Sequence, residues 1–169
     1  MIDTAVLTIS DSSHRGKRVD RSGPAVTQRL DQLGYHVTVA EVLPDEAAAI
    51  SDRLAALADS GCVSVIFTTG GTGVAERDVT PEATRAVLHK EMPGLGEQMR
   101  AEGRKSTHLA ALSRSTAGIR GRTLIVNLPG SPRGAVESLN AIVDLVPHVV
   151  DLLHGKTEHA HESKLDLPR

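Results

Sequence analysis

The amino-acid sequence predicts an α/β protein in which a single three-layer domain contains a mostly parallel sheet with helices on both faces. Four short apolar runs, at residues 5–9, 36–43, 63–67 and 123–128, are typical of strands that are covered on both faces. Segments with helical periodicity lie between them, and this alternation is the pattern of a parallel sheet. The chain has 169 residues, a length that suits one hydrophobic core.

The first connecting segments can be assigned in order along the chain. Residues 10–23 contain charges, serines and glycines without periodicity, which predicts a long loop at the carboxyl end of the first strand. Helices are predicted over residues 24–33 and 45–59, each followed by a glycine, Gly34 and Gly61. These helices return the chain to the start of the next parallel strand.

The later part of the chain is predicted to be mostly helical. Residues 80–104 are expected to form two helices that are broken at Pro93-Gly94. Residues 134–153 keep a helical period through Pro147, which should kink the helix or break it. This last helix is expected to close the fold.

The folded domain is assigned to residues 1–155, and residues 156–169 are assigned to a polar C-terminal tail without periodicity. The histidines His154, His159 and His161 do not have the spacing of a structured metal site. We therefore expect an exposed tail.

Composition excludes several classes of function. The formal net charge is −2 and only 1% of residues are aromatic, so the chain has neither a general attraction for nucleic acid nor rings on which bases could stack. No apolar stretch approaches the roughly 20 residues of a membrane span. The sole cysteine, Cys62, cannot form an intrachain disulfide and is expected to be buried and inert. We expect a cytoplasmic protein without nucleic-acid or membrane partners.

A glycine-rich turn after the third strand is the most informative motif. The turn consists of Gly70, Gly71, Thr72 and Gly73. Glycine adopts positive φ and lets amide groups approach a phosphate, so the turn predicts an anion site in addition to a tight connection. The lysine of a P-loop and the third glycine of a dinucleotide fingerprint are both missing. Thr80 is the expected N-cap of the next helix and Pro81 its first residue, which would place a helix N-terminus beside the anion.

Two aspartates follow strand ends and suggest a divalent metal. Asp78 comes after the glycine turn, where a carboxylate would repel a phosphate unless a cation lies between them. Asp45 follows the second strand, and its simpler role is to cap the next helix. Because the carboxyl ends of parallel strands meet at one edge of a sheet, the alternative is that Asp45 and Asp78 together bind one Mg²⁺ ion.

Two further loops are predicted at the same edge of the sheet. The loop after the fourth strand begins at Asn127 and contains Pro129, Gly130 and Ser131. It is a turn in which Gly130 lets the backbone approach a ligand and Ser131 offers a hydroxyl. Ser10 and Asp11 end the first strand and either cap a turn or bind the ligand, whereas Ser22 is expected to cap the following helix.

Seven blocks of sequence resemble, in order, the molybdopterin adenylyltransferases of the Mog/MoaB type, with the closer resemblance to the Mog type. The blocks are VLTISDS at residues 6–12, PDE at 44–46, TGGTG at 69–73, RDVTPEAT at 77–84, EMPGLGEQMR at 91–100, LSR at 112–114 and NLPGSP at 127–132. The resemblance covers nearly the whole chain and implies the fold of a molybdopterin-binding domain.

The resemblance also implies an activity and the roles of particular residues. Such an enzyme uses Mg²⁺ and transfers AMP from ATP to the terminal phosphate of molybdopterin, in the synthesis of the molybdenum cofactor. Asp45 and Asp78 would be the catalytic and metal-associated pair, the loop at residues 127–131 would contact the nucleotide, and Ser113 and Arg114 would lie near the pterin. A homotrimer and hand-over of the product to a molybdenum-insertion protein are implied as well.

Two other classes of function stay open. Related domains can bind molybdopterin without catalysis, and the same fold can serve a hydrolase or phosphotransferase that acts on another phosphorylated small molecule. The presence of both Asp45 and Asp78, which some MoaB-type relatives replace, favours the transferase.

Overall fold

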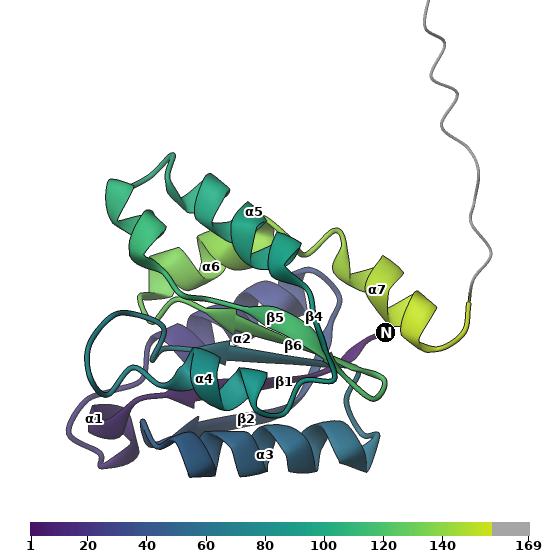
Figure 1. The fold of residues 1–169 in the computed structure, drawn as a ribbon, viewed down its shortest axis with the longest axis horizontal. Helices are drawn as coiled ribbons and strands as arrows, with labels where there is room; N and C mark the ends of the chain where they lie inside the picture. The colour runs from purple at the N-terminus through teal and green to yellow at the C-terminus, as the bar shows by residue number, and fades with distance from the viewer. Residues whose placement is uncertain (157–169) are drawn as a thin grey trace, which may run out of the picture.

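A six-stranded sheet forms the middle layer of the molecule (Figure 1). The computed structural model describes residues 1–156. The strands are β1 (Asp3–Ile9), β2 (His36–Leu43), β3 (Val65–Thr69), β4 (Lys90–Glu91), β5 (Ala117–Arg120) and β6 (Thr123–Leu128). They lie in the order β2-β1-β3-β6-β5-β4; the first four are parallel, and β5 and β4 continue the sheet in antiparallel fashion. The predicted mostly parallel sheet is confirmed.

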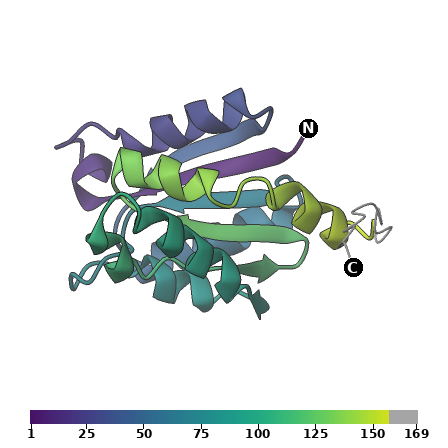
Figure 2. The same ribbon diagram turned by 90° about the horizontal axis from the view of Figure 1, so that it is seen from above.

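Helices cover both faces of this sheet, as the alternation of strand and helix predicts (Figure 2). One face packs against helices α2 (Ser22–Gln32), α5 (Pro93–Gly103), α6 (Pro132–Asn140) and α7 (Val146–Leu153). The other face packs against α3 (Ala47–Ser60) and α4 (Thr80–Arg85). Two short elements, α1 (Asp11–His14) and the 3₁₀ helix η1 (His108–Leu112), complete the structure.

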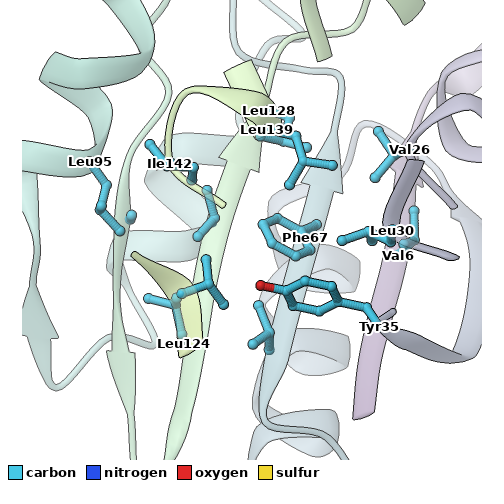
Figure 3. Close-up of a cluster of buried hydrophobic side chains, with 14 of the residues drawn as sticks. Val6, Val26, Leu30, Tyr35, Phe67, Leu95, Leu124, Leu128, Leu139 and Ile142 are labelled. Carbon is cyan, nitrogen blue, oxygen red and sulfur yellow. The ribbon is translucent and has the colours of Figure 1, made fainter. Parts of the chain in front are cut away.

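The core between the sheet and the first group of helices is aliphatic around two rings (Figure 3). Phe67 on β3 is fully buried. Tyr35 lies beside it and donates its hydroxyl to the carbonyl of Val143, 3.1 Å away. Burial, together with the charge of Asp144, raises the pKa of Tyr35 to about 12, so the tyrosine stays neutral and serves packing.

One local prediction is confirmed in part and two require correction. The helical segment at residues 134–153 is broken, as one of the two alternatives at Pro147 predicts, but the break lies between α6 and α7, before Pro147. Pro147 itself lies in the first turn of α7, where its missing N–H costs no hydrogen bond. Pro93 likewise begins α5, and β4 precedes it, so the prediction of a helix across residues 86–92 is wrong. Cys62 is exposed because it lies in the turn between α3 and β3.

The edge strand and the first loop also differ from expectation. β2 alternates between exposed and half-buried residues along most of its length, because it has only one neighbouring strand. The loop predicted at residues 10–23 contains α1. No helix within residues 1–156 is long and apolar enough to cross a membrane. The tail from residue 157 onward, with His159 and His161, lies outside the described residues.

Candidate active site

A cleft lies at the edge of the sheet where β1, β3 and β6 end, the same end at which α1 lies in Figure 1. It consists of two adjoining cavities of about 580 and 390 Å³. Gly71, Gly130 and Ser131 line both cavities and so form the boundary between them. This is the position at which open α/β sheets bind ligands.

The two cavities differ in chemistry. The walls of the larger one include the aliphatic side chains of Val74, Met99, Leu109 and Leu112, together with Arg100. The smaller cavity is lined by hydroxyl and charged residues, namely Ser10, Ser13, Asp20, Ser22, Arg18 and Arg21. Together they can accept a ring system beside phosphate groups.

The predicted site residues divide into two groups. Those that line the cleft are Ser10, Gly70, Gly71, Thr72, Gly73, Asp78, Ser113, Pro129, Gly130 and Ser131. Those that line neither cavity are Asp11, Asp45, Arg114 and Asn127.

The glycine turn brings the ends of three strands close together. Gly70 has φ of +104°, and a Cβ at this position would lie 2.3 Å from the carbonyl oxygen of Ile9. Gly71 has φ of +63°, and a Cβ there would lie 2.3 Å from Oγ1 of Thr80. Both positions require glycine because the conformation and the close approach exclude a side chain.

The turn leaves amide groups free at the cleft. The N–H groups of Gly71, Thr72 and Gly73 make no hydrogen bond to any group in residues 1–156, and the same holds for Gly130 and Ser131. All five residues line the cleft. Successive free amides in such a turn form a concave donor group that suits the oxygens of an anion.

Thr80 is not the N-cap that the sequence predicts. α4 begins at Thr80 itself, Val79 is the N-cap, and no side chain caps this helix. The Thr80 hydroxyl instead donates to the carbonyl of Gly70 at 3.0 Å, and the Thr80 N–H donates to the carbonyl of Gly71 at 3.1 Å. Thr80 therefore fixes the glycine turn.

Asp45 does not cap α3, so the simpler of its two predicted roles is excluded. The N-cap of α3 is Glu46, which makes no side-chain cap bond. Oδ2 of Asp45 accepts from the N–H of Asp11 at 2.7 Å, and Oδ1 of Asp11 accepts from the N–H of Asp45 at 3.1 Å. This reciprocal pair joins the ends of β1 and β2 and holds Asp45 behind Gly71.

The charges around Asp45 accumulate unfavourably. Burial raises the pKa of the Asp45 carboxyl, and the negative charges of Asp11 and Asp78 raise it further, against the opposing hydrogen bond from the Asp11 amide. A cation bound between these carboxylates would relieve the repulsion and favour the ionised forms.

Asp11 is already paired. Its Oδ2 accepts from Nε and Nη2 of Arg77 at 2.9 and 2.6 Å. Partial desolvation acts in the other direction, but the hydrogen bonds from Arg77 and from the Asp45 amide lower the pKa of Asp11. Asp11 therefore organises Asp45 and the Arg77 loop, whereas its neighbour Ser10 caps α1 by accepting from Ser13 N–H at 3.3 Å.

The loop after β6 is partly buried. Asn127 is fully buried, and its Nδ2 donates to the hydroxyls of Thr68 at 3.0 Å and Thr84 at 2.9 Å. The side chain joins β6 to β3 and α4 and lines neither cavity, so a ligand contact of Asn127 stays a prediction. Ser131 caps α6 by accepting from the N–H of Gly134 at 3.1 Å.

Ser113 and Arg114 follow η1 and point in different directions. Ser113 lines the larger cavity, and its hydroxyl donates to that of Ser115 at 2.9 Å. Arg114 lines neither cavity, because its guanidinium bonds to Gly73, Asp78 and Glu82. The two adjacent residues that the resemblance places near the pterin are therefore separated by the structure.

The comparisons with known proteins agree with this geometry. Residues 5–148 match a family described as a probable molybdopterin binding domain. The chain belongs to this family. The resemblance found from the seven sequence blocks is confirmed.

Individual relatives align with most of this chain. The molybdopterin adenylyltransferase of Helicobacter pylori (strain J99) is 39% identical over 97% of this chain and 94% of its own length. That of Escherichia coli (strain K12) is 41% identical over 89% of this chain and 77% of its own length. The crystal structure of the molybdopterin biosynthesis enzyme MoaB from Thermus thermophilus is 48% identical, covers 92% of this chain and 98% of that chain, and has a TM-score of 0.86.

The donor groups of this member of the family fit a metal shared with a ligand. Within residues 1–156, no three His, Cys, Asp or Glu side chains are grouped so that they could hold a metal ion by themselves. Oδ1 of Asp45 and Oδ1 of Asp78 accept no hydrogen bond in this part of the chain. Two free carboxylate oxygens suit Mg²⁺, which takes few protein ligands and completes its shell with phosphate oxygens and water.

The sequence did not identify several residues of this site. Ser22 is not the N-cap that the sequence predicts, because α2 begins at Ser22 and its N-cap is Arg21. Asp20 accepts from the first two N–H groups of the helix, those of Ser22 and Gly23, and from the Thr8 hydroxyl. Only the spacing of Asp20 from the helix could have indicated this. Arg18 lines the smaller cavity from a segment without a motif that would distinguish it from a surface arginine. Arg100 lines the larger cavity and ends the block at residues 91–100, but that block was not assigned to the site.

Proposed function

We propose that this chain is a molybdopterin adenylyltransferase. In this reaction an oxygen of the terminal phosphate of molybdopterin attacks the α-phosphorus of ATP, the bond from that phosphorus to the pyrophosphate oxygen breaks, and adenylylated molybdopterin forms. The names of the H. pylori and E. coli relatives support the choice of reaction. The observation that carries it is the pair of cavities that meet at a row of free amides.

The cleft geometry supports a reaction between two phosphorylated molecules. Each cavity can hold one substrate, and the boundary at Gly71, Gly130 and Ser131 is where their phosphates would meet. The free amides of the turn donate to phosphate oxygens and hold them in line, which supplies orientation and charge stabilisation without a covalent intermediate.

We assign Mg²⁺ binding to Asp45 and Asp78. The ion, when bound, would offset the negative charge of the transferring phosphoryl group. Asp78 lines the larger cavity, and Asp45 lies behind Gly71, held there by Asp11. This role requires the ionised form of Asp45. Burial and the charges of Asp11 and Asp78 raise the pKa of this carboxyl, and a bound cation would lower it.

One experiment separates this function from the two alternatives. Purified protein is incubated with ATP, Mg²⁺ and molybdopterin, and both adenylylated molybdopterin and pyrophosphate are measured. Formation of the two products in equal amounts supports the transferase. Binding of molybdopterin without product would identify a non-catalytic binding module, and release of phosphate without the adenylylated product would identify a hydrolase or phosphotransferase.

We also propose that the protein assembles as a homotrimer, with one cleft per subunit. The exposed aliphatic residues Leu145 and Leu152 near α7 support an interface away from the cleft. Light scattering at micromolar concentration should give about three times the chain mass of 17.9 kDa. A monomer with full activity at every concentration would contradict this assembly.

A further inference from the structure

The loop that carries Asp78 has few anchors of its own. Residues 74–77, between the glycine turn and Asp78, are all exposed, and the side chain of Val74 is 74% exposed. Two short bonds lie within the loop, from Ala75 N–H to Oδ2 of Asp78 and from Asp78 N–H to the Ala75 carbonyl, both 2.9 Å. Neither bond attaches the loop to the rest of the domain.

A single guanidinium closes the two ends of this loop. Nε of Arg114 donates to the carbonyl of Gly73 at 2.6 Å, and Nη2 donates to the carbonyl of Asp78 at 2.6 Å. Nη1 donates to the carboxylate of Glu82 on α4. The Arg114 backbone N–H also donates to the carbonyl of Thr72 at 3.0 Å.

The loop carries one acidic residue and holds a second. Asp78 lies at the end of the loop and lines the larger cavity. Arg77, in the same loop, binds Asp11, which in turn bonds to Asp45. A shift of the loop would therefore move both the Asp78 carboxylate and the Arg77 guanidinium that binds Asp11.

We propose that Arg114 is a positioning residue that fixes Asp78 by clamping the carbonyls at residues 73 and 78, rather than a residue that touches substrate. All three nitrogens of its guanidinium have protein acceptors, and the side chain lines neither cavity. The planar fork is essential to this role, because one flat group reaches two carbonyls and a carboxylate with fixed geometry. The catalytic consequence rests on the proposed transferase function, but the clamp itself does not.

Hydrogen exchange of the loop tests the clamp without any assay of activity. Arg114→Met and Arg114→Lys should each speed exchange of the Ala75 and Asp78 amides, the two that donate hydrogen bonds within the loop, by about tenfold or more, because the loop then opens locally without unfolding the domain. Lysine should not restore the slow exchange, since one ammonium group cannot reproduce the fork. Exchange at wild-type rates in both variants would overturn the proposal.

Two control variants separate the clamp from general stability and from the ion pair. Arg120→Met removes a similar arginine that bonds to Asp59 and to the Val87 carbonyl away from the cleft, and it should leave exchange at residues 74–78 unchanged. Glu82→Gln removes the carboxylate partner but keeps both carbonyl bonds, so exchange and activity should stay near wild type.

Kinetics then test the role in catalysis. Arg114→Met should lower kcat by about 10- to 100-fold, the size expected when a catalytic group is displaced by about 1 Å, and should change the KM for molybdopterin by less than about twofold. Loss of activity with exchange unchanged, or a large rise in KM alone, would mean that Arg114 contacts substrate directly. If the wild-type protein forms no adenylylated product, the proposed function fails while the exchange results still decide the clamp.

Discussion

Replacing Asp45 with asparagine should lower turnover without lowering stability at pH 7. Burial and the negative charges of Asp11 and Asp78 raise the pKa of the Asp45 carboxyl, so ionisation of this group opposes folding. An acid whose pKa rises on folding loses stability as the pH increases from its unfolded pKa, near 3.9, through its folded pKa. Asparagine keeps an oxygen that can accept from the Asp11 amide and removes the charge, so the melting temperature should equal or exceed that of the wild type.

The loss of activity follows from the same charge. If Asp45 stabilises the transferring phosphoryl group through a metal, kcat should fall by about 10²-fold or more, equivalent to about 2.7 kcal/mol or more of transition-state stabilisation. Formation of adenylylated molybdopterin at saturating ATP and Mg²⁺ measures kcat, and differential scanning calorimetry at pH 7 measures stability. Stability and activity are thus expected to change in opposite directions.

Asp59→Asn is the matched control. Hydrogen bonds from Arg120 lower the pKa of Asp59, so its ionised form is the stabilising one above its unfolded pKa. This variant should therefore be slightly less stable at pH 7 and fully active. Turnover near wild type in Asp45→Asn would refute the catalytic role of Asp45. A drop in the melting temperature of Asp45→Asn, of the size seen on loss of a helix cap, would refute the argument that the charge of Asp45 opposes folding.

Three further changes test other parts of the site. Gly130→Ala places a methyl group 3.2 Å from Gly70 Cα at the boundary of the two cavities. The Kd for ATP or molybdopterin in calorimetric titration should rise about tenfold or more while the melting temperature changes little. Unchanged binding of both ligands would mean that they bind elsewhere. Asn127→Ala leaves buried hydroxyls without their donor and should lower the free energy of unfolding, measured in urea, by about 1–3 kcal/mol. The folded protein should keep its kcat, and a loss of kcat alone would support a ligand role. Asp11→Asn removes a charge that raises the pKa of Asp45, so the acid limb of the kcat/KM profile should move to lower pH, whereas an unmoved limb would assign that limb to another group.

The inner strands β1, β3 and β6 could be predicted because they are buried on both faces. β3 and β6 are fully buried, and this appears in the sequence as continuous apolar runs. The antiparallel pair of β4 and β5 could not be predicted, since strands of two and four residues are too short to show a period. Sequence patterns therefore indicated the layers but not the antiparallel edge.

The glycine turn was predictable for a similar reason, because its positive φ values restrict the residue type. The partners of polar side chains were less accessible. Nothing in the spacing of Asp11 and Asp45 indicates that each accepts a hydrogen bond from the other's amide. Arg114 is also 36 residues from Asp78 in the chain, yet bonds to its carbonyl. Such pairs depend on how distant loops pack at the sheet edge, which local sequence does not record.

The floor of the cleft consists of main chain, since a Cβ at Gly130 would lie 3.2 Å from Gly70 Cα and a Cβ at Gly70 would lie 2.3 Å from the carbonyl oxygen of Ile9. Wall positions such as Leu109 and Leu112 lie instead on η1, outside the strands, with their side chains 71% and 56% exposed. Substitutions there can alter the size and polarity of the opening without changing the course of the backbone below. Redesign of this protein for a different ring system should therefore begin with η1, leaving the place of the phosphates unaltered.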